Sequence, residues 1–409
     1  MKSKKNVWIV NHYAQTPSGP GGTRHFQLSQ FLPEYGWKPF ILAASTEHHT
    51  GHQRLDSNQT FRLDTVERVP FLWLFAPSYK GNGLGRILNM LIFSIQLLKP
   101  RPVRLLPPPD LIIGSSVHPF AVWSAYLLSR KYRVPFIFEV RDLWPQTLID
   151  FGKLRNRGIA AILLRKLEAF LYHKSNAIIT LLPNAYRYIQ RFGIKRDRVY
   201  WVPNGVDLSR WDLSQKPSYR DRDGLCLMYF GSFGLANSLE TLLYAMHALS
   251  ERDNPPLVRL RLIGDGPMKS SLESLAVRLK LTNVIFEKPV MKKDIPSLAA
   301  EADCFVVALM DSPLYNYGIS LNKLYDYMAA SKPVIIASGA VNNPIAEAGA
   351  GFSVGPGDVS ALADAFVRMA QLDPVVRNKM GKAGRTYVEQ HHDSRFLAYK
   401  LAKIMNGCL

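Results

Sequence analysis

The sequence has little cysteine, and its cysteines are not arranged to do chemistry. Three cysteines in 409 residues lie far apart, without the spacing of a metal site or a disulfide framework: Cys226, Cys304 and Cys408. This scarcity favours a reducing compartment. A histidine cluster at positions 48, 49 and 52 has no fourth ligand nearby for tetrahedral zinc. The sequence therefore predicts neither a metal centre nor a bound cofactor.

The sequence also lacks a long apolar run. The first run after the basic N-terminal cluster is too short for a signal peptide, so we interpret it as the first strand of a domain. The longest run, within Arg86–Leu98, is about 12 residues long, whereas a helix needs about 20 to span a bilayer. It belongs to an apolar segment, Phe71–Pro109, that ends in the basic residues Lys99, Arg101 and Arg104. This composition is typical of a helix in the membrane interface, although a buried helix can share it.

Acidic residues are scarce in the first half of the chain. Residues 1–208 contain 28 lysines and arginines but 12 aspartates and glutamates, a net charge of +16, whereas residues 209–409 carry +3. This asymmetry indicates that one domain meets a polyanionic surface. The sequence contains no RNA-recognition, helix-turn-helix or zinc-finger pattern. We therefore expect an anionic membrane surface and no nucleic acid, in a cytoplasmic protein peripheral to the inner face of the cell membrane.

The length predicts two domains, and the apolar pattern predicts their class. Apolar strand-like runs alternate with helical stretches, which is typical of α/β domains with parallel sheets covered on both faces. The pattern restarts after Asp207–Asp223, a polar stretch that we interpret as a linker. We expect two Rossmann-like, doubly wound domains, 1–208 and 209–389, that face a central cleft, with a helix at about 390–409 packed on the first. The predicted strands are Val7–Asn11, Phe40–Ala44, Leu111–Ser115, Phe136–Val140, Ala177–Leu181, Val199–Val202, Leu225–Phe230, Arg259–Ile263, Val284–Glu287, Cys304–Ala308, Val334–Ala337 and Gly351–Val354.

The stretch Gly318–Ser338 is the most informative part of the chain. It predicts a loop, a short helix capped by Ser320 or Asn322, and a buried strand. Lys323 and Asp326 then lie one turn apart on one face of the helix. A cation at a helix N-terminus attracts a diphosphate, and a carboxylate can accept sugar hydroxyls, so the pair is a candidate clamp for a nucleotide-sugar. A surface ion pair is the alternative.

Glycine-rich loops follow several predicted strands. The first, Ser18–Arg24, lacks the GxGxxG dinucleotide pattern, and a tight turn is the alternative to a backbone that approaches a ligand. The loop after Phe230 leads into a helix and predicts a phosphate cradle. Two further strand-end loops could frame a base. The candidate residues in these loops are Gly21, Gly22, Gly231, Ser232, Gly234, Gly264, Asp265, Gly266 and Val290.

Charged residues gather at the end of a buried strand in Phe138–Pro145. Glu139, Arg141 and Asp142 stand where ligands bind in such sheets. Trp144 offers a face on which a sugar could stack. His118, after the preceding strand, is a further candidate. An internal network of arginine and carboxylates is the alternative.

Four motifs in order resemble the retaining glycosyltransferases of family 4, which have the GT-B fold. They are Gly21–Gly22, Val202–Asp207, Leu262–Pro267 and Tyr325–Val334. The strand-end motif at Arg141–Pro145 and the motif at Asn322–Ala330 resemble a bacterial subgroup that builds surface polysaccharides on lipid carriers. The resemblance implies a nucleotide-sugar donor, UDP-linked and carrying an N-acetylated or deoxy hexose. It also implies a polyprenyl-diphosphate-linked saccharide as acceptor, and retention without a metal.

The resemblance also implies roles for residues, with two departures. Asp326 falls on the second acid of the family's E-x7-E motif, but Gly318 falls on the first. Relatives often carry histidine where Arg141 stands, and a basic pair in the second-domain glycine loop where this chain has none. We expect Arg141, Asp142 and Lys323 to be catalytic. The expected donor-binding residues are those of the glycine loops with Ser320, Leu321, Asn322, Lys323 and Asp326, and the expected acceptor-binding residues are Glu139, Trp144 and His118.

Two other functions have the same broad pattern. A GT-B epimerase or hydrolase would act on its nucleotide-sugar alone, and the apolar basic segment argues against it because such an enzyme needs no membrane. A non-catalytic, two-domain sugar-binding protein of the periplasmic type would need a signal peptide, which the sequence does not show.

Overall fold

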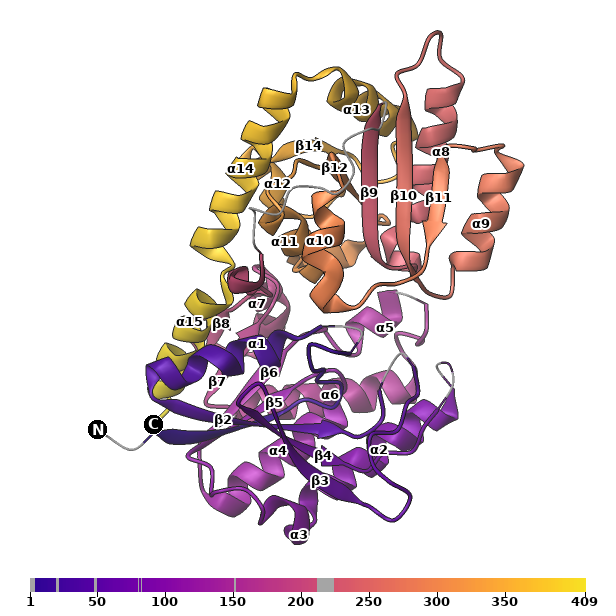
Figure 1. Cartoon of the computed structure of the whole chain (residues 1–409). Helices are drawn as coiled ribbons and strands as arrows, with labels where there is room; N and C mark the ends of the chain where they lie inside the picture. The colour runs from indigo at the N-terminus through magenta and orange to yellow at the C-terminus, as the bar shows by residue number, and fades with distance from the viewer. Residues whose placement is uncertain are drawn as a thin grey trace. The chain divides into compact units, whose positions relative to one another are not determined.

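The chain folds into two α/β units, shown in a computed structural model that describes residues 4–19, 22–47, 50–79, 81, 83–150, 152–211 and 224–409 (Figure 1). Residues 1–204 and 394–409 form the first unit, and residues 205–393 form the second. Most of the predicted linker lies outside the described residues. The first unit ends before the predicted boundary at 208, because Val206 bridges to Asp393 and Asp207 caps a 3-10 turn, both within the second unit.

The first unit contains an eight-stranded sheet in the order β3-β4-β2-β1-β5-β6-β7-β8. All neighbouring strands are parallel except the hairpin β3–β4. The strands are β1 Lys5–Val10, β2 Trp37–Ala44, β3 Phe61–Val66, β4 Val69–Leu74, β5 Leu111–Ser115, β6 Phe136–Val140, β7 Ala177–Thr180 and β8 Val199–Trp201. The helices are α1 Arg24–Phe31, α2 Leu84–Leu98, α3 Pro100–Val103, α4 Pro119–Tyr132, α5 Gln146–Asp150, α6 Ile159–Lys174, α7 Ala185–Ile189 and α15 Ser394–Asn406.

The second unit contains a six-stranded parallel sheet in the order β11-β10-β9-β12-β13-β14. The strands are β9 Leu225–Ser232, β10 Val258–Asp265, β11 Val284–Glu287, β12 Cys304–Ala308, β13 Val334–Ala337 and β14 Gly351–Val354. The helices are α8 Leu239–Ser250, α9 Lys269–Arg278, α10 Ile295–Ala300, α11 Asn322–Ala329, α12 Pro344–Ala348, α13 Val359–Gln371 and α14 Pro374–His391. Short 3-10 turns include η5 Leu235–Asn237, η6 Lys292–Asp294 and η7 Pro313–Tyr317.

The predicted class is confirmed, and all twelve predicted strands are present. The hairpin β3–β4 was missed. Phe71 and Trp73, which the sequence analysis placed in the apolar membrane segment, are buried in β4 and pack in the core of the first unit. That part of the prediction is wrong, because an apolar strand and an interfacial segment have the same composition. None of the helices in the described ranges is long and apolar enough to cross a membrane.

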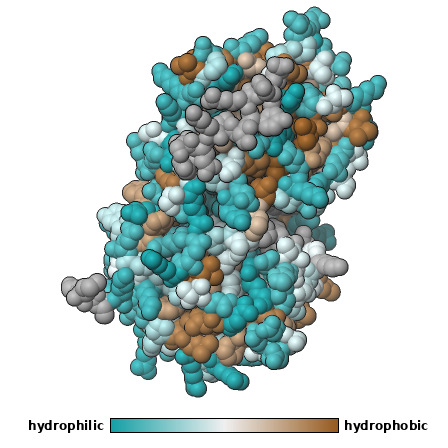
Figure 2. All heavy atoms as spheres, viewed as in Figure 1, coloured by the Kyte–Doolittle hydropathy of each residue, from teal (hydrophilic) through white to brown (hydrophobic). Residues whose placement is uncertain are grey.

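Helix α2 has an apolar face on each side. Its inner face packs on α4, and Phe93 is fully buried there. Its outer face exposes a stripe of aliphatic side chains at helical spacing: Leu84, Ile87, Leu88, Leu91, Ile95 and Leu98. In the space-filling view, hydrophobic patches interrupt a largely hydrophilic surface on both units (Figure 2). The buried-helix alternative therefore holds for the inner face of α2, and the membrane-interface helix stays a prediction for the outer face.

Candidate active site

Lys323 lies in the first turn of α11 and points its ammonium at the end of strand β9. Its Nζ donates to the hydroxyl of Tyr229 at 2.7 Å and to Oδ1 of Asn237 at 2.5 Å. The Nζ atom also lies 4.4 Å from the centre of the Tyr229 ring. These partners are neutral, and burial lowers the pKa of Lys323 to about 7. When it is protonated, Lys323 is therefore a cation for which the described residues provide no compensating carboxylate.

Asp326 follows on the same helix and is buried, with 7% of its surface exposed. Burial raises the pKa of its carboxyl, and the charge of Lys292 opposes that rise. Among the described residues, the carboxylate makes no hydrogen bond and no ion pair, with Lys323 or with any other group. The surface-pair alternative is therefore wrong, and two groups able to bind a ligand remain.

The start of α11 differs from the predicted capping. Leu321 is the N-cap residue, and it makes no side-chain cap, while Asn322 is the first helical residue and Ser320 precedes the cap. All three are half-buried. The preceding loop is held by Asn342, which accepts from the Ile319 amide at 2.7 Å and donates to the Ile319 carbonyl at 3.0 Å. The sequence analysis did not single out Asn342.

The glycine loops of the second unit have a packing role that the sequence analysis did not foresee. Gly264 and Gly231 are partners in register on β10 and β9, and a Cβ on Gly264 would stand 1.9 Å from the Gly231 carbonyl oxygen. Its φ of +151° also disfavours any other residue. A Cβ on Gly266 would similarly stand 2.6 Å from the Phe233 carbonyl oxygen. These glycines let the strand ends meet beside Lys323.

The other predicted donor residues occupy varied places in the second unit. Gly231 borders Lys323, since a Cβ there would stand 3.4 Å from the lysine Cδ. The Ser232 carbonyl accepts from Tyr229 and Asn237, and Gly234 caps η5. The predictions for Asp265 and Val290 stay predictions. Asp265 is exposed and accepts from the Gly266 amide, and Val290 is exposed before η6.

Glu139 is the centre of a buried polar network in the first unit. Its side chain is 2% exposed and accepts from Arg24 at 2.9 Å, His25 at 2.7 Å and Ser115 at 2.7 Å. Burial alone would raise the pKa of Glu139, but His25 and Arg24 hold it well below its usual range. Both oxygens are occupied, so direct acceptor binding by Glu139 does not fit this arrangement. The internal-network alternative holds for Glu139, with Arg24 rather than Arg141 as its partner.

The network joins the first helix to the end of the first unit. Arg24 also donates to the carbonyls of Val202, at 2.9 Å, and Pro203. Burial lowers the pKa of His25, and a neutral ring fits its contacts, with Nε2 donating to Glu139 and Nδ1 accepting from Asn11. Gly22 lies just before this helix, while Gly21 lies outside the described residues.

His118 is fully buried at the start of α4. Its Nδ1 accepts from the Ala121 amide at 3.3 Å, and its Nε2 is hydrogen-bonded to His12. Burial, followed by the charge of Arg86, lowers its pKa to about 3, so the ring is neutral. The structure therefore gives His118 a capping role and no open position for an acceptor.

Arg141, Asp142 and Trp144 follow β6 and are accessible. Arg141 is half-buried, and its guanidinium has no hydrogen bond or ion pair with any described residue. Its amide donates to Ser116 at 3.1 Å. Asp142 is exposed and Trp144 is half-buried. Of the four charged or aromatic candidates in this motif, these three can meet a ligand and Glu139 cannot.

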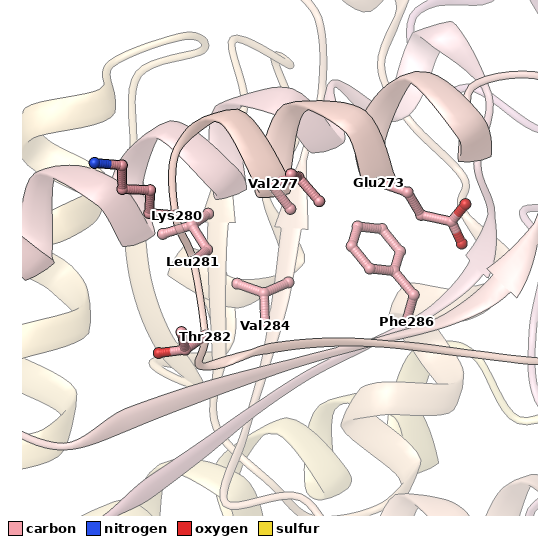
Figure 3. A pocket seen from close by; sticks show the side chains of 8 residues that line it. Glu273, Val277, Lys280, Leu281, Thr282, Val284 and Phe286 are labelled. Carbon is pink, nitrogen blue, oxygen red and sulfur yellow. The ribbon is translucent and has the colours of Figure 1, made fainter.

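A groove elsewhere in the second unit contains none of the predicted residues. It has a volume of about 390 Å³ and lies between α9 and β11, where Val277, Leu281, Val284 and Phe286 converge (Figure 3). It is open and mainly apolar, without a charged pair suited to a diphosphate. No group of three or more potential metal ligands occurs among the described residues.

Two family models match successive parts of the chain. One, described as Glycosyltransferase Family 4, matches residues 21–210, and the other, described as Glycosyl transferases group 1, matches residues 225–371. A probable glycosyltransferase of Pseudomonas aeruginosa, WbjE, is 22% identical over 354 residues, 80% of this chain and 81% of the relative. The putative colanic acid biosynthesis glycosyl transferase WcaI of Escherichia coli is 24% identical over 59% of this chain and 60% of its own.

Solved structures share the fold at low sequence identity. Sucrose-phosphate synthase from Thermosynechococcus elongatus has a TM-score of 0.75 at 17% identity and covers 99% of both chains. Anabaena Alr3699/HepE in complex with UDP-glucose has a TM-score of 0.68 at 15% identity, covering 98% of this chain and 99% of its own. With the two parallel-sheet units, the two family models show that this chain belongs to the GT-B glycosyltransferases, with a family 4 domain followed by a group 1 domain.

Proposed function

We propose that this glycosyltransferase moves a hexose, N-acetylated or deoxy, from a UDP-sugar to a lipid-linked saccharide in the biosynthesis of a surface polysaccharide. The proposal rests on two groups of α11 that make no ion pair among the described residues, the ammonium of Lys323 and the carboxylate of Asp326. The names of two relatives support the pathway class, since they refer to colanic acid and teichuronic acid biosynthesis. A related structure with UDP-glucose supports the donor class.

Lys323 in this proposal neutralises the donor diphosphate. The ammonium is held by Tyr229 and Asn237, and the first N–H groups of α11 add positive potential on the same side. Charge develops on the diphosphate as the bond between the sugar C1 and the phosphate oxygen breaks, so a pre-positioned cation lowers the barrier. Asp326 accepts hydrogen bonds from hydroxyl groups of the donor.

The reaction proceeds with retention and without a protein nucleophile. The acceptor hydroxyl oxygen forms a bond to C1 on the face that the diphosphate leaves, and its proton passes to the departing phosphate oxygen. Orientation then accounts for much of the protein's contribution. The half-buried Arg141 and the exposed Asp142, after β6, are proposed to act at the lipid-linked acceptor, and Trp144 provides a stacking face.

The first unit is proposed to bind the inner face of the cell membrane through α2. The exposed aliphatic stripe supplies apolar contact, and the chain from 68 to 109 contains six basic residues and no acidic one. A second copy of the protein would place like charges together, so an anionic bilayer is the better partner. Peripheral binding brings the enzyme to a lipid-linked acceptor.

The first test is donor binding and transfer across a panel of nucleotide sugars with two variants. Lys323→Met is expected to lower transfer by on the order of a hundredfold, and Asp326→Asn by about tenfold or more. Neither variant should lose much thermal stability, because each removes a charge that no ion pair compensates among the described residues. Lys280→Met, an exposed lysine in the groove of Figure 3, is the matched control. Full turnover in both α11 variants would exclude this donor site.

Metal independence is a second expected outcome. In this proposal the ammonium of Lys323 neutralises the diphosphate, which a divalent metal ion does in other transferases. Transfer measured after chelation with EDTA should equal transfer in untreated enzyme. Activity that is lost with EDTA and restored by Mg²⁺ or Mn²⁺ would contradict the proposed mechanism.

A further inference from the structure

Arg141 carries a positive charge that the first unit does not neutralise directly. Its guanidinium is half-buried after β6 and makes no hydrogen bond or ion pair among the described residues. The nearest buried carboxylate, Glu139, already accepts from Arg24 and His25. Partial burial of an unpaired cation costs stability, which suggests that a ligand supplies the anion.

Arg86 brings a second guanidinium to the same strand ends. It lies in the first turn of α2 and donates from Nε to the hydroxyl of Tyr13 at 3.2 Å, after β1. Burial lowers the pKa of His118, at the start of α4, and the positive charge of Arg86 lowers it further. Burial raises the pKa of Asp142, after β6, and the charges of Arg141 and Arg86 oppose that rise. Strands β1, β5 and β6 are neighbours in the sheet, so these groups converge from adjacent loops.

The balance of charge in this cluster is positive. Arg24 pairs with Glu139, whereas Asp142 makes no ion pair with Arg141, although the charges of both guanidinium groups oppose the rise that burial causes in its pKa. His118 is neutral, because its Nδ1 accepts from a backbone amide and burial lowers its pKa to about 3. The guanidinium of Arg141 therefore remains for a ligand. The ligand must carry concentrated negative charge, since guanidinium groups bind phosphates in bidentate geometry.

The same turn of α2 begins the exposed aliphatic stripe. Leu84, Ile87 and Leu88 flank Arg86, and the stripe continues to Leu98 at the end of the 15-residue helix. The helix is about 22 Å long at 1.5 Å per residue. An anion-binding group is thus continuous with a long apolar surface. This juxtaposition matches a molecule with a phosphate head and a hydrocarbon tail.

We propose that Arg86 and Arg141 form a subsite for the diphosphate of the lipid-linked acceptor, whose hydrocarbon chain extends along the outer stripe of α2. The inference rests on the proposed function, and it adds a second diphosphate site, in the first unit, to the donor site of Lys323 in the second. Asp142, beside both arginines, then faces the first sugar of the acceptor. Arg141 is assigned to the acceptor rather than to the donor sugar.

The test measures binding of farnesyl diphosphate by calorimetry to the full chain with UDP at saturation, so that the donor site is occupied. Arg141→Gln and Arg86→Gln should each weaken binding by about tenfold or more, the equivalent of about 1.4 kcal/mol. Arg130→Gln, exposed at the end of α4, is the matched control and should bind like the wild type. Farnesol and inorganic pyrophosphate, which present the tail or the head alone, should each bind more weakly than farnesyl diphosphate.

The outcomes separate this inference from the donor-site proposal. UDP affinity, measured first in each protein, should be unchanged in both arginine variants, and its absence in the wild type would count against the donor site alone. Farnesyl diphosphate affinity that is unchanged in both arginine variants overturns the subsite. Loss of UDP affinity in those variants also overturns it, because the arginines would then serve the donor. Folding of each variant is verified by its unfolding temperature.

Discussion

Two charged side chains, the buried Glu139 and the half-buried Lys323, differ in whether another charge compensates them. Glu139 accepts from Arg24 and from His25, and its ionisation is maintained by those partners. Lys323 has two neutral partners, Tyr229 and Asn237. The ion pair of Glu139 holds loops of the first unit together, whereas Lys323 is available to bind an anion. Burial of a charged side chain therefore does not identify a ligand-binding site by itself. Burial of a charge that no opposite charge compensates does indicate one.

The pH dependence of donor binding follows from the pKa of Lys323. Burial lowers it to about 7 in the free protein, so the amine loses its proton above that pH and must regain it when a diphosphate binds. Affinity for a UDP-sugar, whose diphosphate does not titrate near neutrality, should fall above pH 7 by up to about tenfold per pH unit. Calorimetric titration between pH 6 and pH 9 measures this slope.

The matched variant for this experiment keeps the charge. Lys323→Arg should bind with a flat profile, since arginine stays protonated throughout this range. Stability should follow the opposite sign from binding: the unfolded lysine retains its proton up to about pH 10.5, so the wild type should gain stability as pH rises above 7. A wild-type binding profile as flat as that of the arginine variant would contradict the lowered pKa.

The residues of α11 could be predicted from the sequence, but the role of Glu139 could not. The spacing of Lys323 and Asp326 fixes their common face once the helix is recognised. The partner of Glu139 is Arg24, 115 positions away, and their contact exists only because β6 ends near the start of α1. Sequence patterns carry local periodicity, whereas the pairing of distant charges depends on tertiary structure.

At the scale of elements, α2 is more apolar outside than inside. Its buried residues include the polar Asn89, Ser94 and Gln96, while its exposed stripe is entirely aliphatic. Asn89 and Ser94 donate hydrogen bonds within the unit, to the carbonyls of Pro77 and Met90 respectively. A helix that served the core alone would have the reverse distribution. The stripe therefore indicates an apolar partner.

Removing part of this stripe should release the protein from membranes. Each exposed leucine or isoleucine that becomes serine removes roughly 1–2 kcal/mol of apolar transfer energy. The double variant Leu88→Ser/Ile95→Ser should lower binding to vesicles with anionic lipids by on the order of a hundredfold, with an unchanged unfolding temperature. Cosedimentation with vesicles measures the binding, and high salt should weaken what remains.

The control is a residue on the inner face of the same helix. Phe93 is fully buried and stacks on His12 at 4.5 Å, so Phe93→Ser should destabilise the protein by roughly 3 kcal/mol or more. Phe93 and Leu91 belong to the same predicted apolar run, Arg86–Leu98, but the structure buries Phe93 and exposes Leu91. The helix period assigns the two to different faces, but which face is buried depends on α4, which the sequence pattern of α2 does not include. Equal vesicle binding by the double variant and the wild type would exclude α2 as the membrane contact.

At the scale of the whole molecule, the first unit is built from both ends of the chain, residues 1–204 and 394–409. The last helix, α15, belongs to the first unit, where it packs on α1. Alternating strands and helices predict two sheets from the sequence, because each βα step repeats the same local pattern. The hairpin β3–β4 breaks that pattern and was missed. The exact end of the first unit depends on a bridge between Val206 and Asp393, a pairing with no local signal.

Truncation at residue 393 should therefore unfold the first unit and leave the second intact. Leu397, Leu401 and Met405 are buried in the core of the first unit with Leu28 and Leu32. Each is worth roughly 2–5 kcal/mol when a core loses it, and their combined loss exceeds the stability of an ordinary domain. Residues 205–393, in contrast, contain their own two-sided core around β9 and β12. Calorimetry measures the unfolding transitions of the full chain, of 1–393 and of 205–393. The transition that the full chain shows and 1–393 lacks should also be missing from 205–393. A 1–393 chain that keeps every transition of the full chain would show that α15 adds little to the first core.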